Sequence, residues 1–393
     1  MSQTSRPSGR WRLVVVGGGS AAAVQVRKGD IPPQETLVIA ERLGTGMAFL
    51  GRATLQSYIE ELLVSTAAAE LHSMVPAGEL RPSAAQYDTY VRESLLQTGA
   101  SVMLARVLDI QRDAHGFVLT LRTPGGVHRQ VHADSVVLAT GSAPRKPPAD
   151  WQAAGAISYD LVHRELAQVG PHRWAGNSVV VVGAGNSAMQ TASLMAPDAR
   201  DITILAKRYV GMYPAESEDR FAWRAPSQLT YELVVKSSNE CGRRPWRVPC
   251  VRHIVYDALE LGDDAFSWTY QETSNLDVLG LHSMAGRCRH ARGRQESDGT
   301  WVESRDRDST VVVWATGSVP VYPPGELVSS LRRDPDGTVA RDEHGRTDVP
   351  GLFVTGACAG HRAVNETVPA RTRPTRVQLR QSGSEAAEER IKV

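Results

Sequence analysis

The stretch RLVVVGGGSAA, residues 12–22, decides the fold. Its β-branched run predicts a buried strand, and the glycines that follow predict a tight turn into a helix. The turn matches the G-x-G-x-x-A pattern of a dinucleotide site at Gly17, Gly19 and Ala22. In that pattern the first glycine permits the turn, the second lets the backbone approach a pyrophosphate, and the small third residue keeps the helix close to the sheet.

A second apolar strand, TLVIA, follows at residues 36–40 and leads directly into Glu41, about 24 residues after Gly17. A carboxylate at this position can accept hydrogen bonds from the ribose hydroxyls of a dinucleotide. We expect Glu41 and the adjacent Arg42 to contact the bound nucleotide. A glycine turn in an unrelated α/β domain is the alternative explanation.

The stretch SVVVVGAGNSA, residues 178–188, repeats the strand and the glycine turn. The matching positions are Gly183, Gly185 and Ala188. Its second strand, DITILAKR, ends on Lys207 and Arg208 instead of an acid. A pair of cations there suits the 2′-phosphate of NADPH, and two solvated charges at a strand end are the alternative.

Two further strand-and-turn passages resemble each other: SVVLATGSAP at 135–144 and TVVVWATGSVP at 310–320. We expect the chain to pass between two domains at these points, with Gly141 and Gly317 letting the backbone lie close to the cofactors. A last apolar strand is stopped by Gly356, which we expect at the first nucleotide site.

The predicted fold class is therefore α/β, with two Rossmann-like dinucleotide-binding domains, the second inserted into the first. The first, for FAD, is expected to comprise residues 1–169 and 306–393. The second, for NADPH, is expected at 170–305 and to carry segments that line the substrate site. Two dinucleotide sites in one chain suggest that the nicotinamide reduces the flavin, which then performs the harder chemistry.

Smaller elements can also be predicted. We expect helices at about 54–66 and 83–98, and strands at 101–110 and 117–122, the last followed by a TPGG turn. The charge-mixed stretch at about 286–309 reads as a surface hairpin or loop. The charged tail from about residue 370 reads as a frayed, solvated end.

Composition excludes several function classes. Lys and Arg total 44 against 43 Asp and Glu, a net charge of +1, which disfavours binding to nucleic acid or to a membrane surface. There is no 18-residue apolar run, and the first ten residues lack the apolar core of a secretion signal, so we expect a cytoplasmic protein.

Cysteine usage and the absence of other motifs narrow the chemistry. The four cysteines, Cys241, Cys250, Cys288 and Cys358, include no CxxC pair, which disfavours both a disulfide scaffold and a dithiol reductase. No HExxH, GxSxG or Walker A motif occurs, and we expect no metal site. Oxygen activation, hydride transfer to an organic acceptor and electron transfer to a partner remain.

Further stretches carry a resemblance to a known family. The start GGGSAAAVQV, 17–26, is similar to GGGPxxLxLA, and ATLQSYIEELLVS, 53–65, to an M-Q-x-x-x-L-K-D-L-V-T helix. PSAAQYDTYVRESL, 82–95, is similar to S-R-x-E-F-x-x-Y, and YPAESEDRFAWRAP, 213–226, to D-x-S-x-F-x-N-E-x-F-x-P. Over about residues 11–370, the chain thereby resembles the N-hydroxylating flavin monooxygenases of the lysine/ornithine type.

The resemblance implies roles for single residues. Gln56 matches the glutamine that lies against the flavin ring, and Asn239, in SSNE, matches a substrate-binding asparagine, so both are candidate catalytic residues. His361, in GHRAVNET, matches a histidine near the substrate. The family's carboxylate-binding lysine falls on Glu61 and another asparagine on Trp223, so these two suit a cationic or aromatic substrate instead of a free amino acid. An exposed acid and simple packing are their alternative explanations.

The activity that the resemblance implies is hydroxylation of an amine nitrogen with NADPH and O2 through a hydroperoxyflavin, as in secondary metabolism. The substrate would be a small or carrier-bound amine, and the protein a homo-oligomer. Oxygenation of sulfur or carbon, and an oxidase or reductase without oxygen insertion, are alternatives. A non-catalytic cofactor-binding protein is the alternative from a different class.

Overall fold

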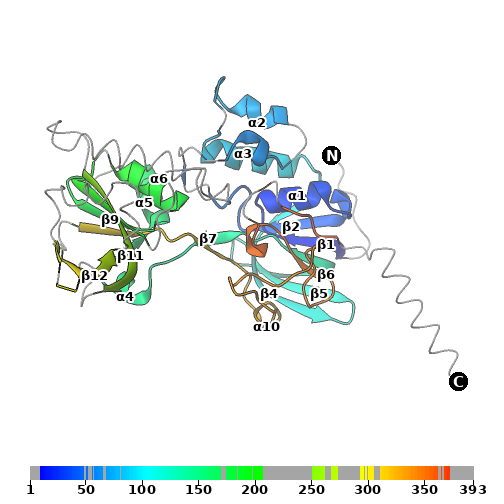
Figure 1. Cartoon of the computed structure of the whole chain (residues 1–393). Coiled ribbons are helices and arrows are strands. Elements are labelled where there is room, and N and C mark those ends of the chain that lie inside the picture. Colours follow the sequence, from blue (N-terminus) through cyan, green and yellow to red (C-terminus); the bar gives the residue numbers. More distant parts are fainter. Residues whose placement is uncertain are drawn as a thin grey trace. The chain divides into compact units, whose positions relative to one another are not determined.

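The chain divides into two compact units (Figure 1). One comprises Met1–Ala48, Ser57–Ala143 and Val319–Val393, and the other Phe49–Gln56 and Pro144–Ser318. The structure, a computed structural model, describes residues 9–47, 50–51, 55, 57–64, 68–79, 81–169, 174–183, 185–196, 198–206, 250–261, 267–272, 293–295, 297–298, 300–304, 310–361, 364 and 367–371.

The first unit is built on a sheet with the strand order β3-β2-β1-β6-β5-β4, and β17 also pairs with β6. Parallel pairing joins β3, β2, β1, the second half of β6, and β17, whereas β4, β5 and the first half of β6 are antiparallel. The bounds are β1 Arg10–Val16, β2 Thr36–Ala40, β3 Ser101–Leu104, β4 Arg106–Asp113, β5 Gly116–Arg122, β6 His128–Leu138 and β17 Leu352–Val354.

Helices accompany this sheet, and α1 and α3 lie side by side (Figure 1). Small residues let α1 approach closely, since Ala21, Ala22 and Ala23 are all buried. The bounds are α1 Ser20–Lys28, α2 Ala68–Met74, α3 Ala84–Leu96 and α10 Glu326–Ser329, with 3₁₀ turns η1 Pro33–Glu35, η3 Ile59–Glu61 and η9 Gly356–Ala359. Apolar residues of β1, β2, β4, β5, β6 and β17 form the core, together with Val328 of α10.

The second unit has the strand order β13-β14-β12-β11-β10-β9-β15-β8. From β8 to β11 the strands are parallel, and from β11 to β13 they are antiparallel. Helices α5 and α6 pack on the parallel part around the fully buried Trp174. The bounds are β8 Ile157–Ser158, β9 Ser178–Val182, β10 Asp201–Ala206, β11 Cys250–Leu261, β12 Ser267–Glu272, β13 Gly293–Gln295, β14 Thr300–Ser304, β15 Thr310–Trp314, α4 Ala149–Ala153, α5 Tyr159–Val169 and α6 Asn186–Met195.

The predicted α/β class with parallel sheets is confirmed. Apart from those of the short segment Phe49–Gln56, the boundaries between the units lie in two short strands, β7 Ser142–Pro144 and β16 Ser318–Pro320. They fall outside the expected 170–305 because β8 pairs with β15 and α5 packs in the second core. Which dinucleotide each unit binds stays a prediction.

The helix predicted at 83–98 is confirmed as α3, but the one at 54–66 is wrong. Among the described residues 57–64, only the 3₁₀ turn η3 forms, and the next helix, α2, begins ten residues after Tyr58. The Glu61 carboxylate accepts from the Tyr58 backbone N–H at 3.0 Å, which fixes the start of this turn. The apolar pattern there therefore reflects a buried loop and not a helix face.

The strand predicted at 117–122 is confirmed as β5, whereas the single strand predicted at 101–110 is wrong. It divides at Ala105, because β3 pairs with β2 while β4 pairs with β5. The hairpin predicted near 286–309 is confirmed by the antiparallel pairing of β13 and β14. The tail prediction lies mostly outside the described residues, but Ala370 is fully buried. No described helix is long and apolar enough to cross a membrane.

Candidate functional site: two glycine turns

The first glycine turn is fixed by its backbone. Gly17 has φ +123°, and its N–H donates to the Ile39 carbonyl at 2.8 Å. A Cβ at Gly17 would overlap the carbonyl oxygen of Ala139, at the end of β6. Only glycine therefore allows β1 to turn this tightly beside the ATG passage.

Beyond this turn, the N-terminus of α1 is open. Gly19 is the N-cap residue, at φ −91°, and among the described residues no side chain caps this helix end. Among the described atoms, only the Gly44 carbonyl oxygen would lie within 4 Å of a Cβ at Gly19, at 3.6 Å. Ala22 is fully buried. The unpaired N–H groups of a helix start and the free space above Gly19 fit a dinucleotide pyrophosphate.

The second glycine turn has the same construction. Gly183 has φ +120°, its N–H donates to the Leu205 carbonyl at 2.7 Å, and a Cβ there would overlap the Ala315 carbonyl oxygen. Gly185 is the N-cap of α6, again with no capping side chain among the described residues and no described atom within 4 Å of a built Cβ. Ala188 is fully buried. This turn therefore fits a second pyrophosphate.

Each ATG passage lies against its own glycine turn. The Ala139 N–H donates to the Val16 carbonyl, and the Ala315 N–H to the Val182 carbonyl, both at 2.8 Å. Gly141 and Gly317, at φ +74° and +95°, follow at once, with no described atom within 4 Å of a built Cβ. Both glycines therefore follow an alanine that lies against a glycine turn, and their contact with a cofactor stays a prediction.

Beyond β2, two candidate nucleotide-binding residues are paired with residues that the sequence did not single out. The exposed Glu41 carboxylate lies 3.7 Å from Arg106 Nε. The Arg42 guanidinium donates to Asp88 Oδ1 at 2.8 Å and to the Thr45 carbonyl at 2.9 Å. Asp88 lies on α3, and nothing in a dinucleotide motif points to it.

The turn after β17 lies close to the start of α1. Gly356 has φ +74°, and a Cβ there would overlap the Ala21 side chain. Its N–H donates to His361 Nδ1 at 3.1 Å. His361 thus lies at the turn after β17, with Nδ1 acting as an acceptor and the proton of a neutral ring on Nε2. Its substrate role stays a prediction.

The Glu61 carboxylate has a local role as the acceptor that caps η3. The neighbouring Tyr58 ring is covered by the Arg81 guanidinium, 4.8 Å from the ring centroid. Glu61 as a substrate contact stays a prediction. The other candidate residues lie outside the described residues: Gln56, Lys207, Arg208, Trp223 and Asn239.

Cys358, on η9, is fully buried. Its thiol donates to the carbonyls of Thr355 at 3.1 Å and Leu138 at 3.4 Å, and burial raises its pKa. A buried thiol with a raised pKa is a poor nucleophile. Within the described residues, no group of three or more His, Cys, Asp or Glu could hold a metal ion.

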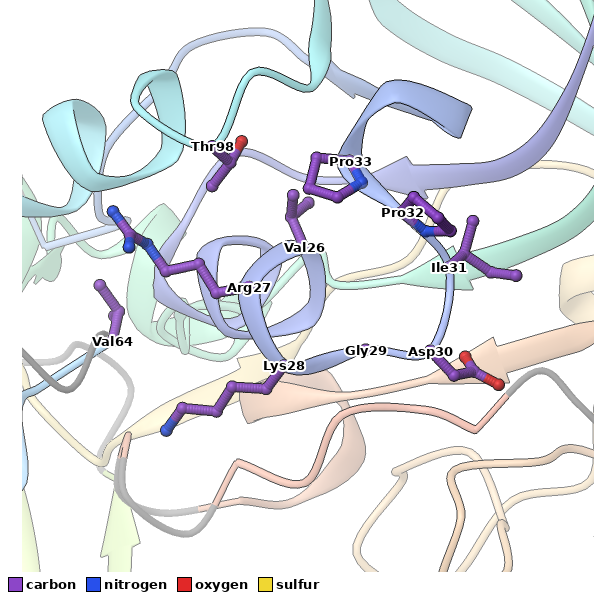
Figure 2. Close-up of a pocket in the computed structure, with 10 residues that line it drawn as sticks. All are labelled: Val26, Arg27, Lys28, Gly29, Asp30, Ile31, Pro32, Pro33, Val64 and Thr98. Atoms are coloured by element: carbon purple, nitrogen blue, oxygen red, sulfur yellow. The ribbon is translucent and has the colours of Figure 1, made fainter.

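A hollow of about 490 Å³ lies at the C-terminal end of α1, between Lys28, Pro33 and Thr98 (Figure 2). The Arg27 guanidinium at its wall donates to the Ser94 carbonyl at 2.8 Å. This hollow is at the opposite end of α1 from the glycine turn, so it is separate from the pyrophosphate position.

Comparison with known proteins agrees with two nucleotide sites. Residues 11–222 match the pyridine nucleotide-disulphide oxidoreductase family, which uses FAD and NAD(P)H. This match covers more than half of the chain. No curated protein sequence matches.

Solved structures share the fold at low identity. The ornithine N-hydroxylase of Kutzneria sp. 744, solved with reduced FAD, NADP⁺ and L-ornithine, is 14% identical, with a TM-score of 0.60 and coverage of 91% of this chain and 95% of that one. The cadaverine monooxygenase of Erwinia amylovora, bound to FAD, is 12% identical, with a TM-score of 0.60 and coverage of 93% and 97%. The bacillithiol disulfide reductase of Bacillus cereus is 17% identical, with a TM-score of 0.57 and coverage of 91% and 93%.

Proposed function

This chain belongs to the pyridine nucleotide-disulphide oxidoreductase family, and on that premise we propose that it is an FAD- and NADPH-dependent monooxygenase. The reaction is hydroxylation of an amine nitrogen, with O2 as co-substrate, on a small or carrier-bound amine. Its coarser character as a flavin-dependent oxidoreductase follows from the family itself.

One observation carries the choice among oxidoreductases. The chain keeps two open glycine turns, but it has no CxxC pair, and the thiol of Cys358 is buried with a raised pKa. No dithiol at CxxC spacing is therefore present to receive electrons from the flavin. The motif resemblance of the stretches at 53–65 and 213–226, and the shared fold of two amine hydroxylases, support oxygen as the acceptor.

Each unit would hold one dinucleotide. The FAD residues are Gly17, Gly19, Ala22, Glu41, Arg42, Gln56, Gly141 and Gly356. The NADPH residues are Gly183, Gly185, Ala188, Lys207, Arg208 and Gly317. FAD, when bound and reduced by NADPH, supplies activated oxygen.

The chain's own residues bind and orient the reactants. Each uncapped helix start attracts a pyrophosphate, and the buried small residues Ala22 and Ala188 hold those helices against their sheets. We assign substrate contacts to Glu61, Trp223, Asn239 and His361. A carboxylate such as Glu61 stabilises a cation, so it would bind the end of the substrate away from the reacting neutral amine.

The test uses purified holoprotein. Under nitrogen, NADPH should bleach the flavin band, and NADH should do so more slowly because Lys207 and Arg208 suit a 2′-phosphate. In air, a panel of diamines, amino acids and carrier-tethered amines should yield a hydroxylamine from at least one member, with NADPH consumed in equal amount.

Other outcomes point elsewhere. Peroxide release with every amine would indicate an oxidase, and an absence of bleaching would leave a non-catalytic protein. The fold shared with a disulfide reductase favours one further candidate, a reductase of an external disulfide. Consumption of NADPH under nitrogen with a disulfide substrate would support that reductase and contradict the monooxygenase.

A further inference from the structure

Asp88 joins α3 to the segment that follows β2. Its side chain is 16% exposed, and Oδ1 accepts from the Thr45 backbone N–H at 2.6 Å and from the Arg42 guanidinium at 2.8 Å. The Thr45 hydroxyl lies 3.4 Å from the same oxygen. One carboxylate oxygen therefore fixes both the backbone and the cation of this segment.

The segment is in turn fixed to the first glycine turn. The Gly44 N–H donates to the Gly18 carbonyl at 2.9 Å. Gly44 has φ +106°, and a Cβ there would overlap the Asp88 carboxylate. The close approach of Asp88 thus depends on glycine at this position, and the glycine turn, the segment and α3 form one connected structure.

The charges of this segment matter for nucleotide choice. At the end of the second strand of a Rossmann unit, an acid accepts the ribose hydroxyls, whereas an arginine nearby accommodates a 2′-phosphate. This chain has both, as Glu41 and Arg42. The Asp88 carboxylate, at 2.8 Å, offsets much of the attraction of the Arg42 guanidinium for a phosphate. It also holds the guanidinium next to the Thr45 carbonyl.

We propose that Asp88 is a positioning and specificity residue of the first dinucleotide site. Asp88 orders the segment beside the glycine turn. Its ion pair with Arg42 also keeps that guanidinium from binding a 2′-phosphate. The site therefore accepts a dinucleotide without that phosphate, such as FAD, and rejects NADPH. A chain with two similar turns and two adenine dinucleotides requires such discrimination. The inference rests on the proposed assignment of FAD to the first unit.

The experiment compares Asp88→Asn with the unchanged protein after removal of flavin. Rebinding of FAD is followed by flavin fluorescence, and the bound FAD is then displaced with 5′-ADP or 2′,5′-ADP. We expect the Kd for FAD to rise about tenfold, the equivalent of one lost charge-assisted hydrogen bond. We also expect displacement by 2′,5′-ADP relative to 5′-ADP to improve at least about fivefold. Adding Arg42→Gln to Asp88→Asn should remove this second effect.

Glu35→Gln is the matched control. It breaks another ion pair of the same unit, from Arg12 to Glu35 at 2.6 Å, at the start of β2 and thus at the opposite end of that strand from Glu41 and Arg42. It should change neither the Kd for FAD nor the displacement ratio. If folded Asp88→Asn protein keeps both values within about twofold, the proposal is wrong.

A second variant covers the case in which Asp88→Asn does not fold. Asp88→Glu keeps the negative charge but shifts the carboxylate, so the Kd for FAD should rise while the preference against 2′,5′-ADP remains. Loss of that preference would contradict the role of charge. Because every readout is flavin retention, these results stand apart from the monooxygenase test: absence of a hydroxylamine product would overturn the proposed function and leave this inference intact.

Discussion

The two glycine turns of this protein have the same backbone geometry and the same neighbouring backbone atoms. Gly17 and Gly183 both have φ near +120°, and each would collide through a Cβ with the carbonyl of an alanine in an ATG passage. In each case the N–H of that alanine, Ala139 or Ala315, donates to the strand before the turn at 2.8 Å. The requirement for glycine thus comes from the neighbouring strand as well as from the turn.

The helices behind the turns are supported differently. On α1, the buried Gln25 side chain accepts from the Ala370 N–H at 2.7 Å and donates to its carbonyl at 3.3 Å. On α6, Thr191 faces the buried His163 of α5, with 3.2 Å between Oγ1 and Nε2. The binding geometry is therefore repeated, whereas the supporting contacts are particular to each unit, and variants can test the two separately.

The largest effect is expected at the turns themselves. Gly17→Ala places an L-residue at φ +123° against backbone, a strain of about 1–3 kcal/mol before the collision is relieved, and should yield protein without FAD. The matched Gly183→Ala should keep its FAD but raise the KM for NADPH more than about tenfold. Flavin absorbance per protein and anaerobic reduction kinetics measure both.

Gly125→Ala is the control for this pair, because its φ lies outside the left-handed region and a Cβ there meets no described atom within 4 Å. Gly125→Ala should keep its FAD and an unchanged KM for NADPH. Loss of FAD from Gly183→Ala with retention in Gly17→Ala would reverse the assignment of cofactors to units.

His163 gives the second unit a dependence on pH. The ring is 3% exposed, and burial lowers its pKa to about 4, partly opposed by Asp160. Since the Thr191 hydroxyl donates to the Ser187 carbonyl at 2.6 Å, the Thr191 oxygen must accept from His163 Nε2–H, which defines the neutral tautomer. Between pH 4 and 6.5 the unfolded state binds a proton that the folded state excludes.

The free energy of unfolding should therefore be highest above pH 6.5. It should fall by about 2 kcal/mol between pH 6.5 and 5. Hydrogen exchange in α5 and α6 over this range would report it. In His163→Gln the fall in the free energy of unfolding with decreasing pH should disappear. Replacement of the exposed His128 by Gln should leave this pH dependence unchanged. An unchanged slope in His163→Gln would show that other groups control the acid sensitivity.

Gln25 tests the support of the first unit. Gln25→Leu leaves the Ala370 N–H buried without its acceptor, which should cost about 1–3 kcal/mol and lower the temperature at which FAD is released. The FAD content at low temperature should not change, because the glycine turn is intact. The exposed Gln111, which bonds Asp109 at 2.7 Å, provides the control Gln111→Leu, with no expected shift. Equal shifts in both variants would mean that the Ala370 contact adds no stability.

The sequence predicted what depends on local backbone geometry and missed what depends on distant pairs. A strand followed by G-x-G-x-x-A indicates the turn at Gly17, because the positive φ and the close Ala139 carbonyl of that turn require glycine. The Gln25–Ala370 pair spans 345 positions and has no local signature. The helix expected at 54–66 was wrong for a different, local reason: Glu61 accepts from the Tyr58 N–H three residues away and caps a 3₁₀ turn, which periodicity alone does not reveal. Asp88 was missed because its role depends on the fold bringing α3 to Gly44.

The smallest effect is expected at the start of α3, and it tests whether capped helix starts differ in role from the uncapped starts of α1 and α6. The start of α3 has a capping box, in which Ser83 Oγ accepts from the Gln86 N–H at 3.2 Å and Gln86 Oε1 from the Ser83 N–H at 2.7 Å. The starts of α1 and α6 have glycine N-caps and no capping side chain among the described residues. If only the uncapped helix starts bind pyrophosphates, Ser83→Ala should lower the free energy of unfolding, measured in urea, by only about 1 kcal/mol. It should leave the Kd for FAD unchanged. Weaker FAD binding in Ser83→Ala, at unchanged stability, would instead make this cap part of the cofactor site and would end the distinction.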